Sequence, residues 1–245
     1  MENKLSQYTR EEFESFAKGI KKIIDIVKSK KPTYIFAPLI GSIPLVDLMC
    51  IADRHFPSEI LEYPPNSSRF KDREKILDKW YRNFLKYNYN GEKIKIVCID
   101  EVVSGSSAVK GYNQFKKSLF DYGKEIKERL DKKIDYEIVG IGEFPTDNKR
   151  NPAFKRLIRD KKANVIEVKR IITSDNIYFN PIRFEIEKIK ESGRYIFKPK
   201  IERFEFSEEY LNLMREFAEY CGVDPNSIKI KNTLKIKESL EKYLE

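Results

Sequence analysis

The sequence predicts an α/β protein with a mostly parallel sheet, helices on both faces of that sheet, and a mainly helical C-terminal extension. Strand-like segments rich in β-branched and aromatic residues alternate with helix-like segments from about residue 33 to 170. Glycine-containing turns follow two of these strands and open the next helices. The alternation stops after residue 170. We therefore expect a sheet domain with an N-terminal helix over 1–170 and an extension or cap over 171–245.

The expected helices are segments in which apolar residues recur three and four positions apart. The first follows Thr9 and Glu12, which have the spacing of a capping box. The predicted helices cover about 10–29, 43–54, 70–86, a long stretch from Val109 to Leu130, 152–162, a segment from Asn180 that Gly193 stops, a segment capped by Ser207 that ends at Gly222, and 232–244. Trp80 lies on the apolar face of its helix, which favours a place in the core over a role in stacking on a base.

The expected strands are shorter and are bounded by turns or prolines. They cover 33–38, 58–63, 93–99, 136–142 and 164–168, and the segment 195–206 is also expected to be extended. In a parallel sheet, ligands bind at the carboxyl ends of the strands, where the strand order reverses. The turns at Gly41 and Gly105 both follow strands, so both are expected at this edge.

Composition excludes several classes of site. The three cysteines stand singly, and the one histidine, His55, is expected on the surface at a helix end, so neither a structural zinc site nor histidine-based nucleophilic catalysis is indicated. The apolar runs are too short to cross a bilayer, and the first residues do not resemble a signal peptide, so we expect a cytoplasmic protein with no membrane partner. The net charge of +9 favours anionic ligands without choosing among them, and a solvated, ion-paired surface explains the lysines equally well.

The segment that carries chemistry is a buried strand that leads into two acids, Asp100 and Glu101, and then into the turn Ser104–Ser107. A turn of this kind at a helix start presents free amides and hydroxyls that suit a phosphate group. The acids at the strand end could bind ribose hydroxyls or help to hold Mg²⁺ through water. The structural alternative is that Ser104 caps the helix and the acids are merely solvated.

This segment resembles the phosphoribosyl diphosphate motif of type I phosphoribosyltransferases, which has an apolar strand, an acidic pair, two apolar residues and then Thr/Ser-Gly-x-Thr/Ser. The segment from Phe36 to Leu45 is similar to the strand, diphosphate-binding loop and helix of that family. The resemblance covers about residues 10–170 in its order of elements.

The resemblance implies a role for each part of the site. Asp100 and Glu101 would be the catalytic acids that face the ribose, and Mg²⁺ would accompany the diphosphate, with no metal ligand assigned directly. Arg69 and Lys71 are candidates to clamp the diphosphate, although a surface role suits them equally well. The residues expected to bind the 5′-phosphate are Ser104, Gly105, Ser106 and Ser107, and those expected beside the diphosphate are Ile40, Gly41 and Ser42.

The sequence departs from the family pattern at two points, and these departures leave open whether the protein is an enzyme or a binding module. Asp100 and Glu101 stand one residue closer to the glycine than in the family, so that Ile99 takes the place of the first acid. Ile40 stands where the family usually has a basic residue. The first hypothesis is therefore a phosphoribosyltransferase with an unidentified acceptor. The alternative is a non-catalytic module on the same fold that binds a nucleotide or sugar phosphate for regulation or defence.

The two hypotheses also indicate which partners the protein has. Both hypotheses require a phosphorylated small molecule, and a homodimer is one of the assemblies that the sequence leaves open. Nucleic-acid binding is a third, disfavoured hypothesis, because the basic residues are spread along the chain and no RNA-binding aromatic motif is present.

Overall fold

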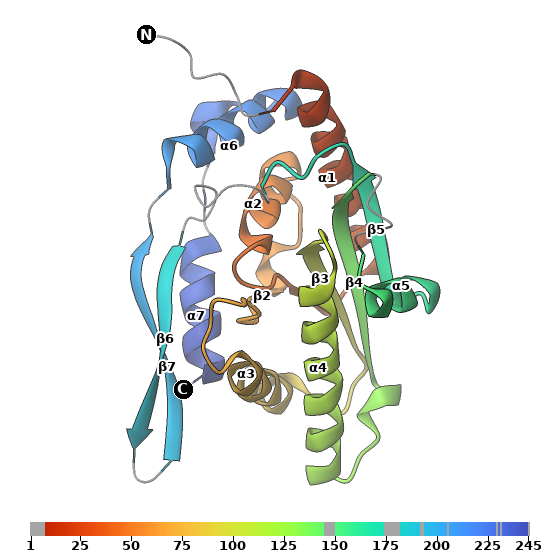
Figure 1. Ribbon diagram of the computed structural model, residues 1–245, viewed down its shortest axis with the longest axis vertical. Coiled ribbons are helices and arrows are strands. Elements are labelled where there is room, and N and C mark those ends of the chain that lie inside the picture. The colour runs from red at the N-terminus through yellow and green to blue at the C-terminus, as the bar shows by residue number, and fades with distance from the viewer. Residues whose placement is uncertain are drawn as a thin grey trace.

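A five-stranded parallel sheet with the order β2-β1-β3-β4-β5 forms the centre of the protein (Figure 1). The computed structural model describes residues 8–144, 150–173, 182–191, 194–204, 206–228, 230 and 232–244. The strands of the sheet are β1 (Tyr34–Phe36), β2 (Leu61–Glu62), β3 (Ile94–Glu101), β4 (Ile134–Glu143) and β5 (Ala163–Val168). The predicted α/β class and the mostly parallel sheet are thereby confirmed.

Helices cover both faces of this sheet, as the sequence predicts. On one face α1 packs against β4 and β5, and α2 packs against β3. On the other face Phe36 of β1 meets Phe84 of α3 at 4.9 Å between ring centroids, and Tyr136 of β4 meets Phe115 of α4 at 4.7 Å. The helices of the sheet domain are α1 (Arg10–Lys30), α2 (Ser42–Ala52), α3 (Arg73–Asn88), α4 (Ser106–Glu125) and α5 (Pro152–Arg159).

The stretch Ile96–Ile99 of strand β3 is continuously apolar because it is buried on both faces of the sheet. Ile96, Val97 and Ile99 are fully buried, which is the pattern of a central strand between two helical layers. Helix α1 begins where its capping box predicts, since the Thr9 hydroxyl accepts from the Glu12 amide and the Glu12 carboxylate accepts from the Thr9 amide. Trp80 is fully buried and stacks on Phe84, in agreement with its predicted place in the core.

Several boundaries in the sheet domain differ from the prediction, and two of them have a clear cause in the chain. The expected strand over 58–63 is a 3₁₀ turn, Ser58–Ile60, followed by the two-residue strand β2, because prolines at 57, 64 and 65 restrict the chain on both sides. The long helix expected to reach Leu130 ends at Glu125. Lys127 there has a positive φ of 59°, which reverses the chain, and Leu130 lies in a separate turn over Leu130–Lys132.

The helix predicted from Asn180 to Gly193 is wrong over the residues that the structure describes. Residues Ile182–Glu191 form strand β6, which pairs antiparallel with β7 (Arg194–Phe204). The isoleucines fit helical spacing, but apolar and charged residues also alternate along 182–187, and alternation favours a strand. Cross-strand ion pairs join Glu187 to Lys200 and Glu191 to Lys198. The prediction that 195–206 is extended is confirmed over Arg194–Phe204.

The last two helices pack onto the sheet domain. Helix α6 (Glu208–Cys221) lies against α2, and α7 (Asn232–Leu244) lies against α3 and β2 (Figure 1). A short 3₁₀ turn, Pro225–Ser227, lies between them. Tyr243 of α7 meets Trp80 at 4.9 Å between ring centroids, and its hydroxyl donates to Glu62 at 2.7 Å. Both helices occur where the sequence predicts them.

Across the described ranges, no helix is both long and apolar enough to span a bilayer.

Candidate functional site

The two glycine-containing loops meet at the carboxyl ends of β1 and β3, where the strand order reverses. The chain leaves β1 toward β2 on one side and leaves β3 toward β4 on the other, so a crevice between diverging connections is expected there. We call the segments Ile40–Ser42 and Ser104–Ser107 the 40–42 loop and the 104–107 loop. The Ser42 hydroxyl donates to the Ile99 carbonyl at 2.8 Å and lies 3.5 Å from Asp100 Oδ1. The predicted position of both loops at one edge is confirmed.

The 104–107 loop forms the start of α4. Gly105 has a left-handed φ of 74° and is the N-cap residue, and no side chain caps the helix from that position. The Ser106 amide donates to Ser104 Oγ at 3.3 Å. Among the described residues, the amides of Ser107 and Ala108 have no acceptor. A helix start with free amides and a positive dipole end attracts an anion.

Residues at the start of α5 hold the 104–107 loop in place. The Asn151 amide donates to the Ser104 carbonyl at 2.8 Å, and its side-chain amide donates to Ser106 Oγ at 3.2 Å. Phe154 is fully buried directly against Gly105, where an added Cβ would lie 2.7 Å from Phe154 Cδ1 and Cδ2. Glycine is therefore required at position 105 both by the backbone angle and by the packing of α5.

Arg73 is the basic side chain that contacts the 104–107 loop. Its guanidinium donates to Ser107 Oγ at 3.0 Å and to Asn66 Oδ1, and Asn66 in turn donates to the Ser107 carbonyl at 3.1 Å. Arg73 is half-buried, whereas Arg69 and Lys71, the predicted clamp residues, are exposed. Burial lowers the pKa of Arg73, and the nearby Tyr81, Asp100 and Glu74 oppose this effect.

Asp100 has a carboxylate oxygen without a partner. Its side chain is buried at 7% exposure, and among the described residues Oδ2 accepts no hydrogen bond. Burial raises the pKa of Asp100 to about 7, although the Glu101 amide, the Ser42 hydroxyl and the Arg73 charge act in the opposite direction. A buried polar atom of this kind is costly unless a ligand satisfies it, and such groups concentrate at functional sites.

Glu101 lies between the 40–42 loop and the segment that follows β5. The Thr173 hydroxyl donates to Glu101 Oε1, and a Cβ on Gly41 would lie 3.5 Å from Glu101 Oε2. Thr173 is itself buried. Each acid has a protein partner for one oxygen, and Asp100 differs because its other oxygen, Oδ2, is buried without a partner among the described residues.

Ile99 and Ile40 contribute apolar side chains at this edge of the sheet. Ile99, which takes the place of the family's first acid, is fully buried and offers its carbonyl to Ser42. Ile40 is partly buried against the core, and the peptide bond between Leu39 and Ile40 is cis. The 40–42 loop thus presents backbone and a serine, without a charged side chain.

A bound Mg²⁺ would have two carboxylates at this edge. No cluster of three or more potential ligands occurs among the described residues. Mg²⁺ keeps several waters and is commonly held by one or two carboxylates together with substrate phosphates, so Asp100 and Glu101 are a sufficient donor set when a phosphate ligand is present.

A scan against models of known protein families and a search of curated protein sequences both gave no match.

Proposed function

We propose that the protein binds phosphoribosyl diphosphate or a related ribose phosphate at the 40–42 and 104–107 loops and transfers the phosphoribosyl group to an acceptor. Two observations carry this proposal: the unpartnered carboxylate oxygen of Asp100 at the end of β3, and the free amides at the start of α4, which Arg73 links because it bonds to Ser107 and acts on the charge of Asp100. The free amides attract a phosphate, and the carboxylate of Asp100 attracts a hydroxyl group or a hydrated cation. A ribose 5-phosphate carries both kinds of group a few bonds apart.

Each loop has one role in this proposal. The amides of Ser107 and Ala108 bind the 5′-phosphate, and Arg73 supports the loop through its hydrogen bond to Ser107 Oγ. Asp100 and Glu101 face the ribose hydroxyls, which can donate to carboxylate oxygens. The diphosphate lies along the 40–42 loop, whose backbone is open to close approach at Gly41. The proposed fold is that of a divergent type I phosphoribosyltransferase, and the parallel sheet with its site at the β1/β3 reversal supports it.

The chemistry is a substitution at the anomeric carbon of the ribose. The bond from C1 to the diphosphate oxygen breaks, and the bonding pair leaves with the diphosphate. A lone pair of the acceptor forms the new bond to C1, and the acceptor loses its proton. Mg²⁺ bound with the diphosphate would neutralise part of the leaving charge. The protein contributes positioning and preorganised charge, with no covalent intermediate.

A non-catalytic phosphate-binding module is the second candidate. Its support is that Ile99 buries an apolar side chain where the family has its first acid, and that Ile40 gives the 40–42 loop no positive charge for a diphosphate. Such a module would bind the sugar phosphate without turnover. The free amides and Asp100 serve this function equally well.

A thermal-shift panel separates these functions. The ligands are phosphoribosyl diphosphate, ribose 5-phosphate and nucleoside monophosphates, each with and without Mg²⁺. A shift that requires both the diphosphate and Mg²⁺ supports the transferase. Equal shifts with ribose 5-phosphate or a nucleotide, independent of Mg²⁺, support the binding module. If none of these ligands raises the melting temperature, the proposed site is wrong.

Replacing Arg73 with methionine is expected to weaken ribose 5-phosphate binding roughly tenfold, because a charge-assisted hydrogen bond to the loop is lost. Methionine keeps much of the aliphatic length, so the packing of α3 changes little. Isothermal titration calorimetry measures the affinity. Arg69→Met is the matched control, since Arg69 is exposed in the connection that precedes α3. If Arg69→Met weakens binding and Arg73→Met does not, the clamp predicted from the sequence is the correct one.

A further inference from the structure

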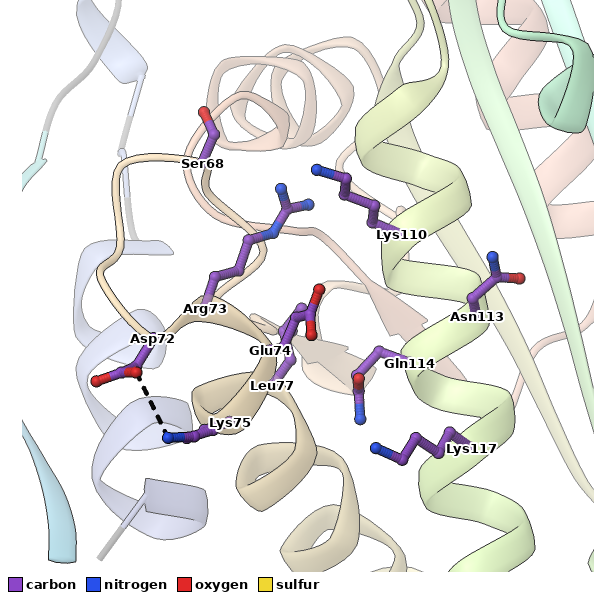
Figure 2. Close-up of a pocket in the computed structure, with 10 residues that line it drawn as sticks. All are labelled: Ser68, Asp72, Arg73, Glu74, Lys75, Leu77, Lys110, Asn113, Gln114 and Lys117. Atoms are coloured by element: carbon purple, nitrogen blue, oxygen red, sulfur yellow. Dashed lines mark ion pairs between the residues drawn. The ribbon is translucent and has the colours of Figure 1, made fainter.

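A groove between α3 and α4 begins beside the 104–107 loop. Its cavity volume is about 680 Å³, and residues from the start of α3 and from one side of α4 line it (Figure 2). Leu77 and Gln114 form buried parts of the wall, and Gln114 is fixed by its bond to Asp78 at 3.0 Å. The charged residues that line the groove are Asp72, Arg73, Glu74, Lys75, Lys110 and Lys117.

The end of the groove nearest the loop carries two cations that point toward the same space. Figure 2 shows the Arg73 guanidinium and the Lys110 ammonium directed toward each other from α3 and α4. Among the described residues Lys110 takes part in no ion pair. Asp72 lies at the rim, where it pairs with Lys75 and Lys188. Glu74 also lines this part of the groove, and Asp100 contributes a further negative charge near Arg73.

The spacing along α4 connects these cations to the loop. Lys110 follows Ser107 by three residues, which is about 4.5 Å along the helix axis, whereas Lys117 is about 15 Å away. Arg73 already donates to Ser107 Oγ at 3.0 Å. An anion between Arg73 and Lys110 would therefore be the immediate neighbour of a phosphate bound at the 104–107 loop. Lys117 lies beyond the reach of a short phosphate chain.

We propose that the space between Arg73 and Lys110 is a second phosphate subsite, which gives the site higher affinity for ribose 5′-diphosphates and 5′-triphosphates than for 5′-monophosphates. This inference rests on the proposed function, because the first phosphate is taken to lie at the 104–107 loop. Nucleoside di- and triphosphates then compete with phosphoribosyl diphosphate for that loop, and the groove makes the protein responsive to their concentration. A small phosphate chain is favoured over nucleic acid because no aromatic side chain lines the described groove to stack on bases.

Titration calorimetry with ribose 5-phosphate and with adenosine 5′-mono-, di- and triphosphate tests the subsite. We expect the di- and triphosphate to bind roughly tenfold more tightly than the monophosphate, the gain of one charge-assisted contact. Lys110→Ala is expected to abolish this difference. Lys116→Ala is the matched control, because Lys116 is an exposed lysine on the same helix that lies outside the groove. It should leave the difference intact.

The possible outcomes distinguish a failure of the second phosphate subsite from a failure of the proposed function. If ribose 5-phosphate binds but the di- and triphosphate gain nothing over the monophosphate, the subsite is wrong and the proposed ribose phosphate site stands. The same holds if a gain is present and Lys110→Ala leaves it unchanged. If none of the ligands binds, both proposals are wrong. If a single-stranded oligonucleotide binds more tightly than the triphosphate, and Lys117→Ala weakens it as much as Lys110→Ala, the groove binds nucleic acid and the subsite proposal is overturned.

Discussion

Replacing Gly105 with alanine is expected to destabilise the fold by roughly 3 kcal/mol and to weaken phosphate binding tenfold or more. Two effects add. Alanine at a φ of 74° is strained by about 1 kcal/mol, and its Cβ would lie 2.7 Å from the ring atoms Cδ1 and Cδ2 of Phe154. Phe154 is fully buried and cannot withdraw without disturbing α5. Urea unfolding measures the stability, and calorimetry with ribose 5-phosphate measures the binding.

Gly222 provides a matched control for this substitution. Its φ of 72° is almost the same, but a Cβ there would meet nothing within 4 Å. Gly222→Ala is therefore expected to show only the backbone strain, about 1 kcal/mol, and unchanged ligand affinity. Equal destabilisation by the two substitutions would contradict the proposed packing of Phe154 against the 104–107 loop.

Replacing Asp100 with asparagine is expected to stabilise the free protein at about pH 8, by roughly 4 kcal/mol, and to abolish Mg²⁺-dependent ligand binding. The reason is that the charged carboxylate is buried with one oxygen unpartnered, which raises its pKa from 3.8 to about 7. The neutral amide removes the buried charge. It also removes the group that would meet a hydrated cation, so stability and function change in opposite directions.

The pH dependence of stability gives an independent measurement at Asp100. With its pKa raised in the folded state, the folded protein holds a proton that the unfolded chain has released between about pH 4 and about pH 7. The contribution of Asp100 to stability therefore falls as the pH rises through this window. In Asp100→Asn this decline is expected to be smaller. Asp25→Asn, at an exposed position on α1, is the control and should reproduce the wild-type curve. If the stability of Asp100→Asn has the wild-type pH dependence, the conclusion that burial raises the pKa of Asp100 is wrong.

Much of the fold and the location of the site follow from local sequence signals. The capping box at Thr9, the buried run of β3 and the glycine turns each depend on residues close together in the chain, so their effects can be predicted without tertiary information. The rule that ligands meet parallel sheets at the reversal of strand order then placed the 40–42 and 104–107 loops together. The hydrogen bond from Ser42 to the Ile99 carbonyl bears out that placement.

The supporting residues of the site could not be predicted in the same way. Arg73 resembles many other basic residues in the chain, and only the direction of α3 brings it, in place of Arg69 or Lys71, to Ser107. Thr173 lies 72 positions from Glu101, and no spacing rule connects them. In the sequence Asn151 is distinguished only by its position before Pro152. The helix predicted from Asn180 to Gly193 failed for a related reason. The isoleucines at 182, 186 and 189 fit helical spacing while residues 182–187 alternate as in a strand, and only the pairing with β7 decides between the two patterns.

The position of α7 has a consequence for the order in which the protein can fold. Its Tyr243 side chain bonds to Glu62, 181 positions earlier, and packs on Trp80, while the Ser239 hydroxyl accepts from the amide of Tyr63. The β2 edge of the sheet is therefore completed by residues near the end of the described chain. Contacts between segments so far apart form late and slow the search for the native state. During synthesis, β1 and β2 must wait for α7 before their edge of the sheet is covered, which makes the nascent chain a candidate client for chaperones.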